Sequence, residues 1–169
     1  KNIAKKNERV KIAIVGKYIS MKDAYISLIE ALNHGGIYND INVDIKWISA
    51  ETLENDKDIE NYFKDINGLI IPGGFGERGI EGKIEAIKYA RENKIPYLGI
   101  CLGMQLMCVE FARNILSYKE ANTIEVNENA KYPIITLMEE QKKNILKGGT
   151  MRLGAFPCEI KEESLSYKL

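Results

Sequence analysis

The sequence predicts an α/β fold with an open, doubly wound and mostly parallel sheet of the flavodoxin-like kind. The first observation is that short β-branched runs alternate with amphipathic helical patterns along much of the chain. The second is that the fourth such run turns directly into a helical pattern at Cys101, which is typical of a nucleophile elbow. Parallel strands need right-handed crossovers, so helices should cover both faces and ligands should bind at the strands' carboxyl ends.

Each element has its own signal. A β-branched run that ends at Gly16 predicts the first strand, an alternating run the second, and short buried runs the third and fourth. The apolar spacing of Ala24, Leu28, Ala31 and Leu32 predicts the first helix. The predicted strands are residues 10–15, 43–48, 68–71 and 97–100, and the next predicted helices are residues 53–63, 79–93 and the helix that follows Cys101.

The last third of the chain has weaker patterns. Residues 117–132 are polar and predict a loop, and residues 133–138 predict a strand. The lysine-rich residues 139–147 predict a surface connection, and a last strand is expected near residues 155–160.

The composition is that of an ordinary globular domain, with 169 residues of which 45% are apolar and 28% charged. Residues 1–9 are charged and aperiodic, which predicts a linker from an upstream domain, and residues 10–169 are expected to form one domain. Lys plus Arg and Asp plus Glu both number 24. A chain with no net charge lacks the overall field that nucleic-acid-binding proteins use, so we expect a small substrate and no nucleic-acid partner.

The sequence gives no sign of a membrane or secretory protein. It contains no apolar run of transmembrane length and no signal peptide, which predicts a cytoplasmic protein without a membrane partner. Three cysteines without paired spacing predict free thiols rather than disulfides or a metal site. Besides Cys101, we expect Cys108 and Cys158 to be core thiols, the latter in the last strand. Met104, Met107 and Phe111 are expected to pack in the core.

The elbow is the strongest candidate for a reactive site. A nucleophile on a sharp strand-to-helix turn is lifted clear of the sheet, and glycines on either side prevent collisions with neighbouring backbone. Gly99 and Gly103 supply that clearance around Cys101. The sulfur would also lie at a helix N-terminus, whose partial positive charge favours the thiolate, the attacking species.

Residues 99–105 (GICLGMQ) resemble the nucleophile motif of class I (triad) glutamine amidotransferases. Three further stretches resemble the glutaminase domain of one branch of this family, in which a separate synthetase domain uses ATP to aminate UTP to CTP. They are residues 15–36, which include VGKY, DAY and ALNHGG, residues 72–79 (PGGFGERG), and residues 149–154 (GTMRLG).

The resemblance implies an activity and its partners. Cys101 would attack the amide of L-glutamine, and the acyl-enzyme would be hydrolysed while ammonia passes to the synthetase domain of the same chain. The resemblance implies no cofactor or metal in this domain; ATP and Mg²⁺ belong to the synthetase domain, and the full-length enzyme would be a homotetramer. The alternatives are another triad amidotransferase, of the GMP synthase or carbamoyl phosphate synthetase type, a peptidase or isomerase of the same fold, or a catalytically incomplete regulatory module.

Thiolate attack on an amide creates an oxyanion that needs backbone N–H donors. Residues 72–79 follow the third strand, so they should lie at the same sheet edge as Cys101, and we expect the amides of Gly74 and Leu102 to be the donors. The alternatives for this loop are a phosphate-binding loop or simply a tight turn, although it lacks the Lys-Ser/Thr of a P-loop.

By resemblance, the substrate-binding residues are Gly74, Leu102, Gly103, Met104, Gln105 and Glu125. A carboxylate at Glu125 could pair with the α-ammonium group of a free amino acid. A helix-surface role for Gln105 and a solvated loop position for Glu125 are the alternatives.

A catalytic base is the missing part of the pattern. The single histidine, His34, lies about 15 Å along a helix that starts near the carboxyl edge of the first strand, which predicts a structural role. The family carries its catalytic His and Glu in a segment beyond Leu169, so the C-terminal part of the domain is expected to be missing and the fragment to hydrolyse glutamine poorly. Lys17, Tyr18, Arg78 and Arg152 are expected to face the sister domain, gate the substrate or lie at the solvated surface.

Overall fold

The computed structural model describes residues 8–17, 19, 22–56, 58–138 and 157–168. The chain divides into two compact units, Lys1–Thr136 and Leu137–Leu169.

The first unit is built on a four-stranded parallel sheet. Its strands are β1 (Arg9–Gly16), β2 (Asn42–Ser49), β3 (Gly68–Ile71) and β4 (Tyr97–Gly99), and their order is β2-β1-β3-β4. The register sets Ile14 beside Trp47 on one side and beside Ile70 on the other. This order confirms the predicted flavodoxin-like sheet, because sequential strands are added on both sides of β1.

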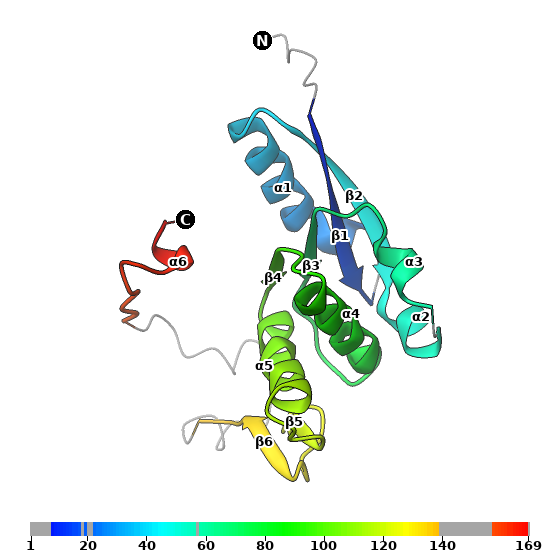
Figure 1. The fold of residues 1–169 in the computed structure, drawn as a ribbon, viewed down its shortest axis with the longest axis vertical. Coiled ribbons are helices and arrows are strands. Elements are labelled where there is room, and N and C mark those ends of the chain that lie inside the picture. The colour runs from blue at the N-terminus through cyan, green and yellow to red at the C-terminus, as the bar shows by residue number, and fades with distance from the viewer. Residues whose placement is uncertain (1–7, 18, 20–21, 57, 139–156, 169) are drawn as a thin grey trace. The chain divides into compact units, whose positions relative to one another are not determined.

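Helices cover both faces of this sheet (Figure 1). A short 3₁₀ helix, η1 (Lys22–Tyr25), leads into α1 (Ile26–Tyr38) on one face, where the ring of Tyr25 lies 5.6 Å from that of Trp47. The opposite face carries α2 (Ala50–Asn55), α4 (Ile80–Glu92) and α5 (Leu102–Asn114). α3 (Glu60–Phe63) contributes Phe63 to the same core.

The prediction of one helix over residues 53–63 is wrong. The structure has two short helices, α2 and α3, and the chain between them is extended at Asp56. The Asp56 carboxylate accepts hydrogen bonds from the Asp58 N–H at 3.0 Å and from the Tyr62 hydroxyl at 2.8 Å. An aspartate that bonds to the backbone two residues ahead stabilises a turn in competition with a helix.

The main core lies between the sheet and the helices of the α4 side. Alternate residues of the central strands, Ala13, Val15, Leu69 and Ile71, point into it, and α4 and α5 supply its other wall with a stripe of residues that includes Ile84, Ile87, Leu106 and Val109. Strand residues of the other parity face α1. This alternation is the period of two expected of a sheet covered on both faces.

A second, two-stranded sheet follows α5. β5 (Ala121–Thr123) pairs in parallel with β6 (Tyr132–Ile135). The loop predicted over residues 117–132 therefore contains a short strand, whereas the strand predicted next to it is present but ends earlier. In the second unit, α6 (Leu165–Lys168) is the one helix of the described residues.

The strand expected near residues 155–160 is not present in its described part, because residues 157–160 have no regular structure. Cys158 is therefore exposed and is not a core thiol. The predicted surface connection at residues 139–147 and the stretch at residues 149–154 lie outside the described residues.

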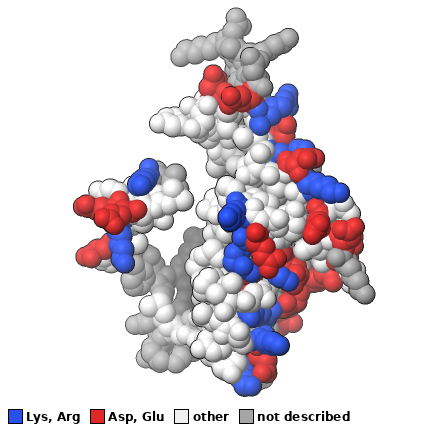
Figure 2. Space-filling view, in the orientation of Figure 1, with Lys and Arg blue, Asp and Glu red and all other residues white. Residues whose placement is uncertain are grey.

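In Figure 2, the charged side chains of the first unit lie mainly along its right-hand side, where Lys and Arg are found beside Asp and Glu. Among the described residues, no helix is both long and apolar enough to cross a membrane.

Candidate active site

Cys101 forms the predicted turn between β4 and α5. It is the residue before the first turn of α5, with φ 53° and ψ −107°, and its side chain is exposed. A positive φ at a residue with a Cβ costs on the order of 1–3 kcal/mol and clusters at functional sites. The sulfur therefore lies at the end of a helix, outside the packed interior, on a strained turn.

Backbone hydrogen bonds hold both sides of this turn. The N–H of Ile100 donates to the carbonyl of Ile71 at 2.9 Å, which fixes the strand side to β3. The N–H of Gly103 donates to the carbonyl of Ile100 at 3.0 Å, and the N–H of Gln105 donates to that of Cys101 at 3.1 Å. Backbone hydrogen bonds on both sides of Cys101 thus fix the conformation of the turn.

Gly99 and Gly103 have the spatial role that the sequence predicts. A Cβ at Gly99 would lie 2.5 Å from the carbonyl carbon of Gly103, and a Cβ at Gly103 would overlap the carbonyl oxygen of Ile71. Neither obstacle is a flexible side chain, so neither can move away cheaply. The close approach of α5 to β3 and β4 requires glycine at both positions.

The glycine-rich loop, residues 72–79, lies at the same sheet edge as the sulfur. A Cβ built at Gly73 would be 3.4 Å from the Cβ of Cys101 and 4.0 Å from its Sγ. The corresponding position on Gly74 faces the side chain of Leu102, at 3.9 Å. The structure therefore brings Gly74 close to Leu102, the other expected oxyanion donor, while Gly73 is the loop residue that approaches Cys101.

Two glycines of this loop have a positive φ. They are Gly76, at 81°, and Gly79, at 78°. Gly79 sits over Ala50, whose Cβ would be 2.8 Å from an added one. The residues with a positive φ therefore lie where the loop turns into α4, downstream of Gly74, the expected oxyanion donor.

Contacts with neighbouring elements hold the loop in place. Lys17, at the end of β1, donates to the carbonyl of Phe75 at 3.4 Å. Arg78 forms an ion pair with Glu51 of α2. A second link to α2 lies at the start of α4, where the N–H of Glu81 donates a hydrogen bond to the Glu54 carboxylate at 3.1 Å. Lys17 and Arg78 therefore make contacts within this domain, whereas Tyr18 and Arg152 lie outside the described residues.

Two residues near the site escaped the sequence analysis. Lys83, on α4, is only 3% exposed, and burial lowers its pKa, an effect that the charge of Lys17 increases and that of Glu54 opposes. The signal was present, because Lys83 occupies the apolar stripe of its helix beside Ile80 and Ile84. Tyr97 is the other, and its hydroxyl donates to the carbonyl of Gly103 at 2.7 Å.

Gln105 and Glu125 are the residues expected to bind the amino acid end of the substrate, and they are less closely connected to the elbow. Gln105 is half-buried, and its Oε1 is buried without a hydrogen-bond partner among the described residues. Glu125 is half-buried in the turn after β5. In the described part of the chain, no hydrogen bond or ion pair joins Glu125 to the elbow, so its role stays a prediction.

The face of α5 that carries Met104 is not in the core. Met104, Met107 and Phe111 are 45%, 41% and 47% exposed, and Cys108 is half-buried. The expectation of core packing for these residues is wrong, because α5 is apolar on both sides and buries the side that carries Leu106 and Val109.

The single histidine, a side chain that could act as a catalytic base, is not part of the elbow. His34 is exposed in the third turn of α1. Within the described residues, no group of three or more His, Cys, Asp or Glu side chains could hold a metal ion. The arrangement around Cys101 therefore offers an accessible thiol, glycine-rich backbone on one side and a helix N-terminus on the other, which suits acyl transfer from an amide.

Most of the chain is similar to known proteins. Residues 20–168 match the family model described as glutamine amidotransferase class-I. The chain is 56% identical over 166 residues to the CTP synthase of Clostridium kluyveri, covering 98% of this chain and 31% of the relative. It is 54% identical over 165 residues to the CTP synthase of Methanocaldococcus jannaschii, with 95% and 31% covered. The chain thus spans about a third of the length of the curated relatives it matches.

A solved structure is similar as well. The Trypanosoma brucei CTPS glutaminase domain with bound acivicin has a TM-score of 0.71 and 36% sequence identity, covering 77% of this chain and 50% of that one. A family match over most of the chain and a like fold, together with the accessible elbow cysteine, lead to one conclusion. The chain belongs to the class-I glutamine amidotransferase family.

Proposed function

We propose that this chain is the glutaminase part of a CTP synthase, in which Cys101 releases ammonia from L-glutamine. The observation that carries the proposal is the position of the Cys101 sulfur, exposed on a strained turn beside Gly73 and the glycine-rich loop. The similarity to CTP synthases over nearly the whole chain supports the choice of this branch over the GMP synthase and carbamoyl phosphate synthetase types.

The proposed reaction has two stages. The Cys101 thiolate adds to the amide carbon of glutamine, and the amides of Gly74 and Leu102 donate hydrogen bonds to the oxyanion that forms. The C–N bond then breaks, the nitrogen takes up a proton and leaves as ammonia, and a thioester remains. Water attacks the thioester, which releases glutamate and restores the thiol.

Substrate recognition is proposed for the residues next to the nucleophile. Gly103, Met104 and Gln105 form the first turn of α5 beside Cys101, and the buried Oε1 of Gln105 has no hydrogen-bond partner among the described residues. Glu125 would pair with the α-ammonium group, which restricts the substrate to a free amino acid.

The proposal for the whole enzyme extends beyond these residues. Ammonia would pass to a synthetase domain that uses ATP and Mg²⁺ to aminate UTP, in a cytoplasmic homotetramer. The single histidine is exposed on α1, and the proton transfers need a base that the elbow itself does not supply. We therefore expect this chain alone to form the thioester slowly, although Cys101 should still react with an electrophile that glutamine-binding residues orient.

The test is covalent labelling of the full chain with a glutamine-like electrophile, with acivicin as a second probe because it binds the similar T. brucei domain. Mass spectrometry should find the label on Cys101 and little on Cys108 or Cys158, and excess glutamine should prevent the labelling. The variant Cys101→Ser should remain unlabelled. An inert Cys101, or labelling that glutamine does not reduce, would favour the regulatory-module alternative.

A further inference from the structure

The hydroxyl of Tyr97 lies inside the nucleophile elbow. Tyr97 is the first residue of β4, and its ring packs against the core on the face that α5 covers. The hydroxyl donates a 2.7 Å hydrogen bond to the carbonyl oxygen of Gly103, in the first turn of α5. This bond joins the strand that leads into Cys101 to the helix that leads away from it.

Burial keeps this hydroxyl a donor. The apolar surroundings raise the pKa of Tyr97 well above its ordinary value, and the negative charge of the nearby Cys108 thiolate raises it further. The phenol therefore remains protonated over the whole pH range in which a cysteine thiolate acts. The hydrogen bond to Gly103 persists under all of those conditions.

This hydrogen bond lies beside a turn whose backbone conformation is unfavourable. The φ of 53° at Cys101 is unfavourable for a residue with a Cβ, and such a conformation persists only where surrounding contacts enforce it. The other hydrogen bonds around the turn come from the backbone, at Ile100, Gly103 and Gln105. In the described part of the chain, the Tyr97 hydroxyl makes the only side-chain hydrogen bond between β4 and α5.

We propose that Tyr97 is a positioning residue for the nucleophile, which holds the first turn of α5 against β4 so that the Cys101 sulfur faces the helix N-terminus and the glycine-rich loop. Without the hydroxyl, Gly103 keeps its place in the helix, but the first turn is free to tilt away from the strand. The thiolate then loses part of the positive environment that the turn provides. This proposal rests on the proposed function for its biological meaning, but not for its test.

The test compares Tyr97→Phe with Tyr62→Phe. Both variants lose one hydroxyl and its hydrogen bond, at 2.7 Å to Gly103 and at 2.8 Å to Asp56, but Tyr62 lies in α3, away from the elbow. The first readout is the rate at which iodoacetamide alkylates Cys101 at a fixed pH of about 7, measured by mass spectrometry of the peptide that contains it. A loss of one hydrogen bond predicts a rate about threefold to tenfold lower in Tyr97→Phe and an unchanged rate in Tyr62→Phe.

Thermal unfolding is measured on both variants to account for stability. No loss of alkylation rate in Tyr97→Phe would overturn the proposal, because a merely structural hydroxyl would leave the sulfur as reactive as before. Equal losses of alkylation rate in the two variants would also overturn it, because the effect would then not be specific to Tyr97. The second readout is labelling by the glutamine-like electrophile, where Tyr97→Phe should lower the maximal rate and leave the concentration dependence unchanged. If the parent chain is not labelled by that probe, the proposed function fails, while the iodoacetamide comparison still decides the role of Tyr97.

Discussion

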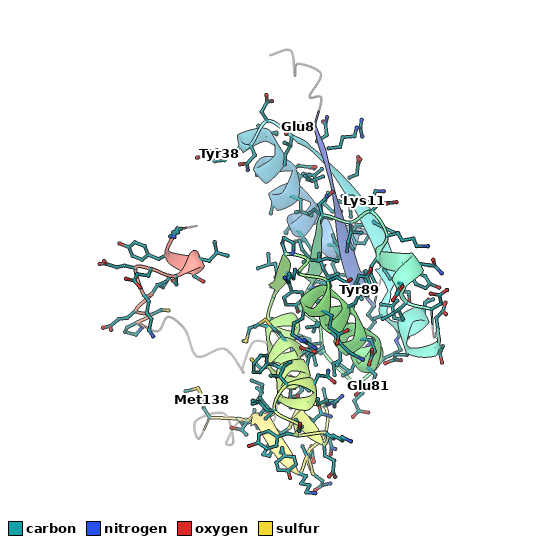
Figure 3. The ribbon with its side chains drawn as sticks, viewed as in Figure 1. Glu8, Lys11, Tyr38, Glu81, Tyr89 and Met138 are labelled. Carbon is teal, nitrogen blue, oxygen red and sulfur yellow. The ribbon has the colours of Figure 1, made fainter. Side chains whose placement is uncertain are left out.

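Arg113 and Glu81 form an ion pair that joins the last turn of α5 to the first turn of α4. Nη1 of Arg113 lies 3.0 and 2.8 Å from the two carboxylate oxygens of Glu81, which is labelled in Figure 3. Nε of the same guanidinium group donates to the carbonyl of Ala121 at 2.7 Å. One side chain thus links the helix that follows the glycine-rich loop to β5, the strand that precedes Glu125.

Replacing Arg113 by Ala should weaken the binding of a glutamine-like probe. The carbonyl of Ala121 would lose its donor, and the turn that carries Glu125 would no longer be fixed to α4 and α5. We expect the half-saturating concentration for labelling of Cys101 to rise about tenfold while the maximal labelling rate changes little, since the charge-assisted hydrogen bonds of Arg113 to Ala121 and Glu81 are lost. The control is Lys131→Ala, which removes the exposed ion pair with Glu120. An equal effect of both variants would contradict this role for Arg113.

Gly103→Ala should disable the elbow. The new Cβ would overlap the Ile71 carbonyl oxygen, so the start of α5 must move away from the sheet. We expect the free energy of unfolding to fall by about 2 kcal/mol and the labelling of Cys101 to become at least about tenfold slower. Urea unfolding followed by circular dichroism and the labelling assay measure the two effects.

Gly35→Ala is the matched control for that substitution. Gly35 lies in α1 with no atom within 4 Å of an added Cβ, so alanine should stabilise the chain by about 0.5–1 kcal/mol and leave labelling unchanged. A Gly103→Ala variant as stable and as reactive as Gly35→Ala would show that the close approach of α5 to β3 is unimportant.

Arg91→Met should destabilise the domain by removing the cation that pairs with a buried carboxylate. Glu110 is 1% exposed and accepts from Nε of Arg91 at 3.0 and 3.1 Å and from Nδ2 of Asn114 at 3.0 Å. Removing the guanidinium group leaves a buried carboxylate without its cation, for which we expect a loss of about 3 kcal/mol in the free energy of unfolding. The double variant Arg91→Met/Glu110→Met should recover most of that loss, and Arg9→Met, at an exposed pair with Asp44, should cost less than about 1 kcal/mol. A double variant as unstable as Arg91→Met would show that the loss comes from packing instead.

The sheet and the elbow were predictable because their signals are local. β1, β3 and β4 read as short apolar runs and β2 as an alternating run, so the positions of the four strands agree with the prediction to within about two residues at each end. Gly99, Cys101 and Gly103 were identified because a strand that passes directly into a helix needs glycine at the close approach. The placement of residues 72–79 beside Cys101 followed from the rule that the carboxyl ends of parallel strands share one edge.

The predictions of helix bounds and burial were wrong where side-chain contacts decide between two possible structures. The break between α2 and α3 depends on the hydrogen bonds of Asp56, and apolar residues all around α5 do not show which side faces the sheet. The burial of Lys83 was indicated by its place in the apolar stripe of α4. The hydrogen bonds of Tyr97 and Arg113 join different elements, so no pattern along the sequence indicates them. The sequence likewise could not connect Glu125 to the elbow.

Lys83→Met should change how stability depends on pH. Burial holds the pKa of Lys83 below its ordinary 10.5, so between the lowered value and 10.5 the unfolded chain binds a proton that the folded chain does not. The free energy of unfolding of the parent chain should therefore rise with pH through that window, and below it the full penalty of burying the charge is present. The methionine variant has no such titration, so it should be more stable than the parent at neutral pH, and the difference should shrink as the pH approaches 10.5.

Urea unfolding of both chains between about pH 7 and 10 measures this difference. Tyr97 acts in the opposite direction above about pH 10, because its raised pKa keeps a proton in the folded state, but it does so equally in both chains and cancels in the comparison. Lys88→Met, on the same helix at a half-buried position paired with Glu85, is the control and should give a curve parallel to that of the parent. Parallel curves for Lys83→Met and the parent would mean that Lys83 keeps its charge in the folded state at no cost, which would contradict the effect of its burial.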